Sequence, residues 1–319
     1  MNVLVTGAAG FLGARLVEVL LEGGYRVLGL DSLDREEPDG WQEARLEQVA
    51  SHKRFEFVQG DVTSPELLQS LFSRFSPKSV VHLASRRDLQ LCEANPIDAF
   101  RLHQQGALNV MITCRRNNTE HLVLASTAHV YGGSRSYPFS ENDGAGKPLS
   151  ILGASFRSME LCAHAFSLRT PVNISVVRLF SVYGPRQSPV RMLPAFMSAA
   201  EKRAPLPIFG DGTVGRDMIY VDDAVVGLLR VLDRPTPWRI INLGSGETTT
   251  VGQVAELVSA EADVMLRTDN KPSRPGEMPN TWADISALEQ VGFKPMVKLP
   301  DGIRRTWKWW QQRPEAFRV

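Results

Sequence analysis

Cysteine is scarce in this chain of 319 residues, which holds three: Cys92, Cys114 and Cys162. Because they are odd in number, widely spaced and free of any C-x-x-C pair, they predict neither a disulfide framework nor a zinc site, and we expect buried reduced thiols. Runs of about 18 apolar residues are also absent, which excludes a membrane-spanning helix. No basic segment precedes the apolar stretch that starts at Asn2, so we expect no signal peptide and a cytoplasmic protein.

An excess of charge of either sign is missing as well. The chain has 36 Lys and Arg against 35 Asp and Glu, a net charge of +1. This balance gives no general attraction to nucleic acid or to an anionic membrane, and we expect neither as a partner. With 43% hydrophobic and 22% charged residues, the composition excludes disordered and collagen-like classes. The length suits two lobes with a sizeable core.

Glycines recur at a fixed spacing near the start of the chain. Residues 2–13, NVLVTGAAGFLG, read as a buried strand followed by Gly7, Gly10 and Gly13, and the helical pattern ARLVEVLLEGG comes next. In this order Gly7 permits a tight turn, Gly10 lets the backbone approach a pyrophosphate, and Gly13 allows close helix packing. The free N–H groups at the helix start attract the anion. The alternative is that the glycines form only a structural turn.

Later strands place polar residues at their ends. The strand YRVLGLD ends in Asp31, roughly twenty residues past the glycines, where a carboxylate binds the ribose hydroxyls of NAD rather than NADP. Alternating strands and amphipathic helices predict an α/β fold, a Rossmann-type doubly wound parallel sheet with its ligand at the carboxyl ends of the strands. The predicted cofactor residues are Gly7, Gly10, Phe11, Leu12, Gly13, Asp31, Asp61, Val62, Leu83, Ala84 and Ser85.

Motifs through nearly the whole chain then resemble one family, the extended short-chain dehydrogenases of the NAD-dependent epimerase/dehydratase group, which act on nucleotide sugars. Besides TGAAGFLG, the motifs are GDV at 60–62, HLAS at 82–85, NP at 95–96, GALNV at 106–110, STAHVYG at 126–132, RLFSVYGPRQ at 178–187, IFGDGTVGRDMIYVDD at 208–223, INLGSGE at 241–247 and RPGE at 274–277. Together they are specific for the family, though not for one member.

The resemblance implies two interleaved lobes. Residues 1–172 and 216–240 form the NAD-binding Rossmann domain, and residues 173–215 and 241–319 form a smaller α/β lobe that closes over a nucleotide diphosphate sugar. The helices at 97–116 and 153–167 match those that form a dimer bundle in the family, which implies a homodimer.

The same resemblance implies substrate contacts. Arg216 and Arg274 match the positions that clamp the diphosphate, a task that suits the bidentate, always charged guanidinium group. For each arginine the alternative is a surface salt bridge. Ser181 stands where many members have an Asn that contacts the substrate, so one contact is shortened or lost.

The catalytic pattern of the family is broken. Its Tyr-x-x-x-Lys pair removes a proton from a sugar hydroxyl and holds the nicotinamide ribose, but Leu152 and Phe156 stand at these two positions. None of the five tyrosines of the chain has a lysine four residues later. We expect Leu152 and Phe156 to form an apolar patch beside the nicotinamide.

Neighbouring positions differ too. Thr127 matches the hydroxyl that bonds the reacting sugar oxygen, whereas Ala128 and His129 replace the Asp and Glu with which the dehydratase branch eliminates water. An ordinary imidazole titrates near neutral pH, which makes His129 the candidate acid/base. The alternative is that His129 only packs or hydrogen-bonds at a strand end. His103, at the place of a usual Asn, is interpreted as structural.

Two functions remain open at this point. The first is an NAD-dependent enzyme of the epimerase/dehydratase group with a rebuilt acid/base set. The second is a pseudo-enzyme that binds NAD and a nucleotide sugar as a regulatory or partner subunit.

Two segments outside the motifs also yield expectations. Residues 35–54 are predicted to form a surface helix and loop. The segment RRTWKWWQQR at 304–313 could stack on nucleic acid, but we interpret it as an amphipathic terminal helix packed on the small lobe.

Overall fold

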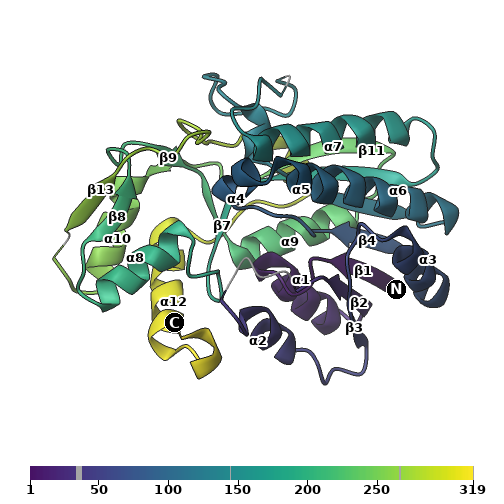
Figure 1. Ribbon diagram of the computed structural model, residues 1–319, viewed down its shortest axis with the longest axis horizontal. Coiled ribbons are helices and arrows are strands. Elements are labelled where there is room, and N and C mark those ends of the chain that lie inside the picture. Colours follow the sequence, from purple (N-terminus) through teal and green to yellow (C-terminus); the bar gives the residue numbers. More distant parts are fainter. Residues whose placement is uncertain (34–37, 144, 266, 319) are drawn as a thin grey trace.

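Seven parallel strands form one sheet in the computed structural model, which describes residues 1–33, 38–143, 145–265 and 267–318. The strand order is β11-β6-β5-β4-β1-β2-β3, so the direction of winding reverses between β1 and β4 (Figure 1). Such an order is typical of the doubly wound fold, and it confirms the predicted class. The strands are β1 (Asn2–Thr6), β2 (Arg26–Asp31), β3 (Phe55–Gln59), β4 (Ser79–His82), β5 (His121–Thr127), β6 (Asn173–Leu179) and β11 (Trp238–Leu243).

Helices cover both faces of this sheet (Figure 1). Successive side chains of a strand point to opposite faces, so Val3 and Val5 join one hydrophobic cluster and Leu4 joins the other. On the Leu4 face lie α3 (Pro65–Phe75), α4 (Leu89–Ala94), α5 (Pro96–Phe100), a π-helix (Arg101–Gly106), α6 (Ala107–Arg116) and α7 (Ile151–Ser167). On the other face lie α1 (Phe11–Glu22), α9 (Val221–Leu232) and α11 (Ser286–Gln290).

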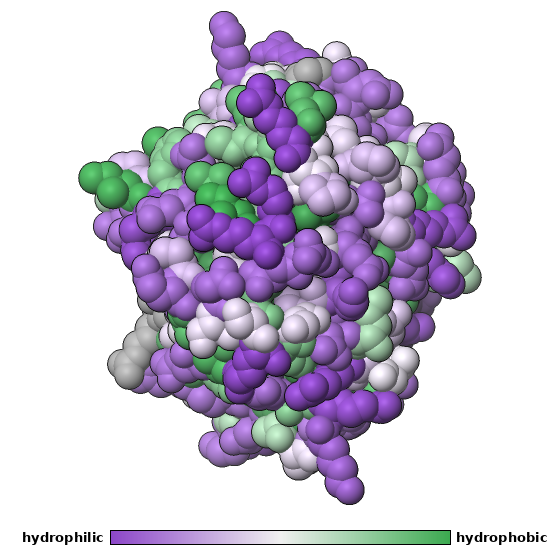
Figure 2. Space-filling view, turned by 90° about the vertical axis from the view of Figure 1, so that its right-hand side faces the viewer, coloured by the Kyte–Doolittle hydropathy of each residue, from purple (hydrophilic) through white to green (hydrophobic). Residues whose placement is uncertain are grey.

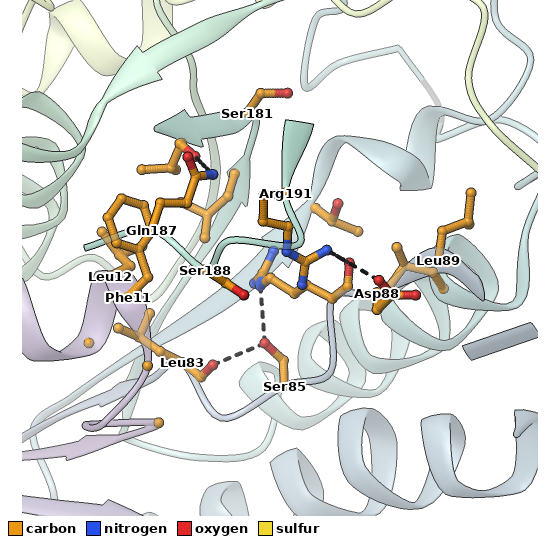
Figure 3. A pocket seen from close by; sticks show the side chains of 18 of the residues that line it. Phe11, Leu12, Leu83, Ser85, Asp88, Leu89, Ser181, Gln187, Ser188 and Arg191 are labelled. Carbon is orange, nitrogen blue, oxygen red and sulfur yellow. Dashed lines mark hydrogen bonds and ion pairs between the residues drawn. The ribbon is translucent and has the colours of Figure 1, made fainter. Parts of the chain in front are cut away.

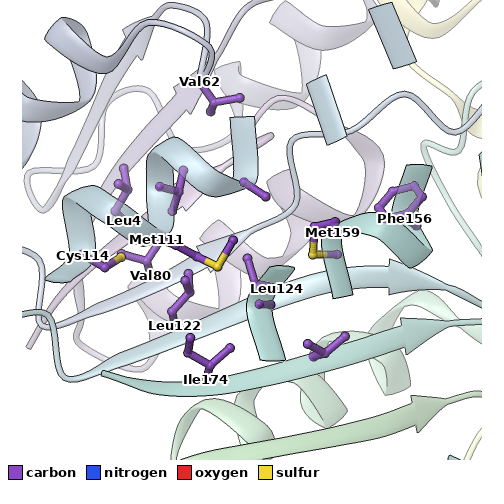
Figure 4. Packing of buried hydrophobic residues seen from close by; sticks show 14 of the residues in the cluster. Leu4, Val62, Val80, Met111, Cys114, Leu122, Leu124, Phe156, Met159 and Ile174 are labelled. Atoms are coloured by element: carbon purple, nitrogen blue, oxygen red, sulfur yellow. The ribbon is translucent and has the colours of Figure 1, made fainter. Parts of the chain in front are cut away.

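Figure 4 shows the packing on the Leu4 face. Leu122, Leu124 and Ile174 project from neighbouring strands toward Met111 on α6 and Met159 on α7. All of these side chains are buried, and together they hold α7 in a fixed position against the sheet. This matters for function because α7 carries Leu152 and Phe156.

Among the described residues, the smaller lobe contains three two-stranded sheets and three longer helices, at the left of Figure 1. Its apolar side chains form a separate cluster that includes Phe196, Val254 and Trp307. The elements are β7 (Ser181–Tyr183), α8 (Met192–Glu201), β8 (Leu206–Phe209), β9 (Gly215–Arg216), β10 (Met218–Tyr220), β12 (Thr249–Thr250), α10 (Val251–Glu261), β13 (Thr268–Lys271) and α12 (Leu299–Gln312).

The boundaries between the lobes differ from the expected ones. β6 pairs with β5 over its whole length, and β11 pairs with β6, so residues 173–179 and 241–243 belong to the large sheet and not to the small lobe. The reason is that NISVVRL is a buried strand with a run of Ile and Val, and buried parallel strands are stable inside a covered sheet. In the other direction, residues 216–220 pair with β7 and β12 and belong to the small lobe.

The C-terminal helix packs as an amphipathic element. Trp307 and Trp310 of α12 are buried in the small-lobe cluster, as predicted from the sequence. The following 3₁₀-helix (Glu315–Phe317) brings Phe317 to the large domain, where its ring lies 5.1 Å from that of Trp41.

Trp41 belongs to α2 (Trp41–Glu47), within the segment expected at the surface. Trp41 and Arg45 are both almost fully buried, so that expectation is wrong for one face of α2, because Trp41 and Ala44 form a cluster with Phe317. Residues 35–37 of the same expectation lie outside the described residues.

The surface and the thiols agree with the composition. In the face shown in Figure 2, hydrophilic side chains predominate and hydrophobic ones are scattered between them. Cys92 and Cys114 are buried as expected, whereas Cys162 is partly exposed, so the expectation of a buried thiol is wrong for Cys162; none of the three cysteines forms a disulfide within the described residues. In the described part of the chain, the helices are too short or too polar to cross a membrane.

Candidate functional site

A cavity of about 490 Å³ lies at the carboxyl ends of the parallel strands, between the large sheet and the small lobe. This is the position at which doubly wound sheets bind ligands. Every predicted site residue except Phe156 lines it: Gly7, Gly10, Phe11, Leu12, Gly13, Asp31, Asp61, Val62, Leu83, Ala84, Ser85, Thr127, His129, Leu152, Ser181, Arg216 and Arg274.

The glycine turn forms one end of the cavity. Gly7 has a φ of +71°, and a Cβ atom on Gly13 would lie 1.9 Å from the Gly7 carbonyl oxygen, so glycine is required at both positions. α1 begins at Phe11 without a side-chain cap and without an acidic residue in its first turn. Its first N–H groups and the positive end of its dipole are therefore suited to bind a phosphate.

Asp31 is fixed beside this turn. Its Oδ2 accepts a hydrogen bond of 2.9 Å from the N–H of Ala9, and its Oδ1 accepts one of 3.0 Å from the N–H of Leu33. Two backbone donors hold the carboxylate in one orientation at the cavity wall. This arrangement is suited to accept hydrogen bonds from two neighbouring ribose hydroxyls.

Arg216 and Arg274 reach the cavity from the small lobe. Arg216 donates to Glu277 Oε1 at 2.8 Å and to the Met278 carbonyl oxygen at 3.1 Å. The guanidinium carbon of Arg274 lies 3.7 Å from the centre of the Phe209 ring, in cation–π geometry. The structure thus brings both arginines to one cavity, and it also places Arg216 in the salt bridge that was the alternative interpretation.

Leu152 and Phe156 do not form the expected apolar patch together. Both side chains belong to the core cluster, but of the two only Leu152, near the start of α7, also lines the cavity. Figure 4 shows Phe156 among the core residues. The Phe156 ring stacks on the His103 ring with centroids 4.3 Å apart. Phe156 is held away from the cavity surface because the aromatic ring gains more from this packing than from contact with water.

His103 has a structural geometry. The Arg86 N–H donates to His103 Nε2 at 3.0 Å, so Nδ1 carries the proton and donates to Ser155 Oγ at 2.8 Å. Ser155 in turn donates to the Leu152 carbonyl oxygen. Burial and the nearby charge of Arg87 lower the pKa of His103 to about 3, which keeps the ring neutral.

Thr127 and His129 lie next to Leu152 in the cavity wall. Thr127 ends β5, and its Oγ accepts a hydrogen bond of 3.3 Å from the His129 N–H, so the hydroxyl proton is left for a ligand. His129 lies in a short 3₁₀-helix (Ala128–Tyr131), and its Nδ1 is buried with no hydrogen-bond partner among the described residues.

The titration of His129 differs from the expectation. Burial, followed by the charges of Arg216 and Arg87, lowers the pKa of His129 to about 4. The expectation that this imidazole titrates near neutral pH is therefore wrong for the protein as it stands. A charged ring would lose its hydration and would face two guanidinium groups.

Sequence reasoning missed a group of polar residues on the side of the cavity beyond the glycine turn. Arg87, Asp88, Gln187, Ser188 and Arg191 all line the cavity. Figure 3 shows the ion pair between Arg191 and Asp88, at 3.7 Å, and the hydrogen bond from Ser85 to the Leu83 carbonyl oxygen. The one sequence signal that could have indicated this group is the pair of arginines at 86–87, directly after HLAS, which places two positive charges at a strand end.

Comparison with known proteins shows the family of this chain. Residues 3–244 match the profile of the NAD dependent epimerase/dehydratase family. The UDP-glucuronate 4-epimerase of Thermodesulfobacterium geofontis is 33% identical over 99% of this chain and 98% of its own length.

Solved structures are similar over the same extent. The UDP-glucuronic acid 4-epimerase of Bacillus cereus, in complex with UDP-glucuronic acid and NAD, has a TM-score of 0.92 at 28% identity, covering 98% of this chain and 99% of its own. The UDP-glucose 4-epimerase of Thermotoga maritima, with UDP-glucose, has a TM-score of 0.90 at 27% identity and the same coverage. The resemblance seen in the motifs is confirmed, and this chain belongs to the NAD dependent epimerase/dehydratase family.

Proposed function

We propose that this protein is an NAD-dependent enzyme that acts on a UDP-activated sugar and moves protons without the Tyr-x-x-x-Lys pair. The observation that carries the proposal is that one cavity joins the glycine turn and Asp31 at the large sheet to Arg216 and Arg274 in the small lobe. Two lobes that present separate anion-binding groups across one cavity fit two phosphate-containing ligands at once.

The residues of the large domain fit NAD. The turn at Gly7 and the uncapped start of α1 would hold the pyrophosphate, and Asp31 would accept from the adenosine ribose. The chemistry that bound NAD would supply is reversible hydride transfer at a sugar carbon. The chain itself has to orient the sugar, exclude water and move the proton of the reacting hydroxyl.

The residues of the small lobe fit the nucleotide diphosphate. Arg216 and Arg274 would bind the phosphate oxygens, and Ser181 and Thr127 would donate to the sugar. The similar solved enzymes carry UDP-glucuronic acid or UDP-glucose, which is why we assign UDP as the nucleotide.

His129 is our candidate for the proton acceptor, acting on a sugar that Thr127 orients. The second cause of its low pKa is the charge of Arg216. A diphosphate bound to Arg216 would neutralise that charge, so the pKa of His129 would rise when the substrate binds. Burial, the largest cause of the low pKa, would remain, so substrate binding would make the neutral imidazole a stronger proton acceptor without charging it.

A second candidate function rests on Leu152 and Phe156. Both side chains are only 2% exposed and neither can exchange a proton. A protein with this pair and with an intact cavity would bind NAD and a UDP-sugar without converting it, as a regulatory or partner subunit.

One experiment separates the two functions. The purified protein is incubated with NAD and a panel of UDP-, dTDP- and GDP-sugars in deuterated water, and the sugars are followed by NMR. We expect a new set of sugar resonances with a UDP-sugar, and their loss in His129→Ala. The matched control is His164→Ala, because His164 is an exposed histidine on α7 outside the cavity.

Unchanged sugars together with ligand-induced thermal protection would support the binding function and contradict the enzyme. Turnover that survives His129→Ala would contradict the role of this histidine alone.

We also propose a homodimer through α6 and α7. Leu161 and Leu168, on α7 and at its end, are exposed by 55% and 72%, and a helix bundle between two copies would cover them. Light scattering after size exclusion would give twice the monomer mass, and Leu161→Glu would shift it toward the monomer.

A further inference from the structure

Arg87 and Phe156 come from distant parts of the chain and meet beside the cavity. The guanidinium carbon of Arg87 lies 5.1 Å from the centre of the Phe156 ring, within cation–π distance. Arg87 belongs to the loop between β4 and α4, whereas Phe156 occupies the position on α7 where the family has its lysine. A positive charge is thus present next to this position, but another element supplies it.

Two hydrogen bonds fix the Arg87 guanidinium. Nε donates to Ser85 Oγ at 3.1 Å, and Nη1 donates to the Ser126 carbonyl oxygen at 3.2 Å. Both acceptors lie at the carboxyl ends of β4 and β5, directly beside Leu83, Ala84 and Thr127 of the cavity wall. The group is therefore held between the glycine turn and the expected position of the sugar.

The third nitrogen of the guanidinium has no acceptor. Nη2 of Arg87 is buried and makes no hydrogen bond in the described part of the chain, and no carboxylate there pairs with Arg87. Arg191 is also positive and donates to the Arg87 carbonyl oxygen, while its own carboxylate partner is Asp88. A buried guanidinium with an unused donor beside a like charge is unfavourable, and a ligand with hydroxyl or anionic oxygens would relieve this.

We infer that Arg87 takes over the cofactor contact of the missing lysine and donates hydrogen bonds to the hydroxyls of the nicotinamide ribose of NAD. The inference rests on the proposed function in that NAD has to bind in this cavity. A guanidinium presents two parallel donors, which match two neighbouring hydroxyl oxygens. Arg87 is in this sense a cofactor-binding residue and not an acid or base.

The presence of Arg87 also explains why position 156 holds a phenylalanine and not a lysine. A lysine at 156 would add an ammonium group beside Arg87, with Arg191 close by, and like charges at such short distances repel. The Phe156 ring instead lies against the Arg87 guanidinium and stacks on the His103 ring. Arg87 and Phe156 thus form a complementary pair that replaces one lysine.

The test compares NAD with ADP, because ADP lacks the nicotinamide ribose. Binding of both is measured by calorimetry for the wild-type protein and for Arg87→Met. We expect the affinity for NAD to fall about tenfold while the affinity for ADP changes less than twofold. The matched control is Arg115→Met, since Arg115 also lies over a phenylalanine ring, 5.4 Å from Phe166, but outside the cavity.

A second variant tests the exchange itself. Arg87→Met combined with Phe156→Lys should recover at least part of the lost NAD affinity, whereas Phe156→Lys alone should destabilise the protein. Equal losses for NAD and ADP in Arg87→Met would mean a structural role and would overturn the inference. An unchanged NAD affinity would overturn it as well. A wild-type protein that binds neither NAD nor ADP would instead refute the proposed function.

Discussion

Arg216 reaches from β9 to Glu277, and its Nη2 lies 2.8 Å from Glu277 Oε1. The Arg216 side chain is 12% exposed, so the ion pair is partly shielded from water and its geometry is fixed. A diphosphate that binds here has to share Arg216 with this carboxylate. The guanidinium fork permits this, because it has five N–H donors and the protein uses only some of them.

Replacement of Arg216 by methionine tests the assigned diphosphate site. We expect Arg216→Met to lower the affinity for UDP by about 10- to 100-fold, because charge-assisted hydrogen bonds are lost, and to leave the affinity for NAD unchanged. Calorimetric titration with each ligand provides the measurement. Arg304→Met is the control, since Arg304 lies exposed on α12. Equal loss of both affinities would show general damage to the cavity.

A methyl group on Gly13 tests the glycine turn. The Cβ atom in Gly13→Ala would lie 1.9 Å from the Gly7 carbonyl oxygen, so the turn has to open. We expect loss of NAD binding and a lower melting temperature. In the control Gly252→Ala the new Cβ meets no atom closer than 3.4 Å, and both properties should stay as in the wild type. Normal NAD affinity in Gly13→Ala would show that the pyrophosphate binds elsewhere.

A single substitution at Leu152 tests whether a tyrosine at this position is all that the site needs for faster sugar conversion. Leu152 lines the cavity, so a larger side chain can extend into it. With Arg87 already supplying a positive charge, we expect Leu152→Tyr to raise the rate of sugar conversion by about 10². Leu152→Phe fills the same space without the hydroxyl and should leave the rate unchanged. An equal gain in both variants would assign the effect to packing.

Stability should depend on pH through buried neutral histidines. His121 is 1% exposed, its Nδ1 donates to the Leu232 carbonyl oxygen, and burial and Arg239 lower its pKa to about 4. Below pH 6.5 His121 binds a proton in the unfolded chain, but in the folded chain it stays neutral until about pH 4. The folded state therefore loses stability as the pH falls from 6.5 to about 4. The loss from this one residue is about 3 kcal/mol at most.

The His121→Gln variant checks this expectation. Melting temperatures are compared at pH 7.5 and pH 5, and the wild type should lose more than His121→Gln between the two. His164→Gln, with an exposed ring, should follow the wild type. Identical losses in all three proteins would mean that His121 is not kept neutral by the fold.

The sequence predicted the parts of the site whose geometry is local. Gly7, Gly13 and Asp31 stand at strand ends and in one turn, and the spacing along the chain already determines their relative places. The position of Phe156 was not predictable in this way, because whether a helical side chain faces a cavity or a core depends on the strands beneath it. The role of Arg87 was not predictable for the same reason, because its contact with Phe156 forms only when β4, β5 and α7 pack together. The boundary at residue 173 was misplaced because β6 becomes part of the large sheet through its partner β5.

The contact between Trp41 and Phe317 has a consequence for how ligands bind. It joins α2 of the large domain to the segment that follows α12 of the small lobe. This aromatic contact helps to fix the separation of the lobes, in addition to the segments of chain that connect them. Asp31 and Arg216 then line a cavity whose dimensions are set before any ligand arrives. A ligand pair that fits this cavity loses little free energy to ordering the protein, and one that is too long or too short gains nothing by flexing it.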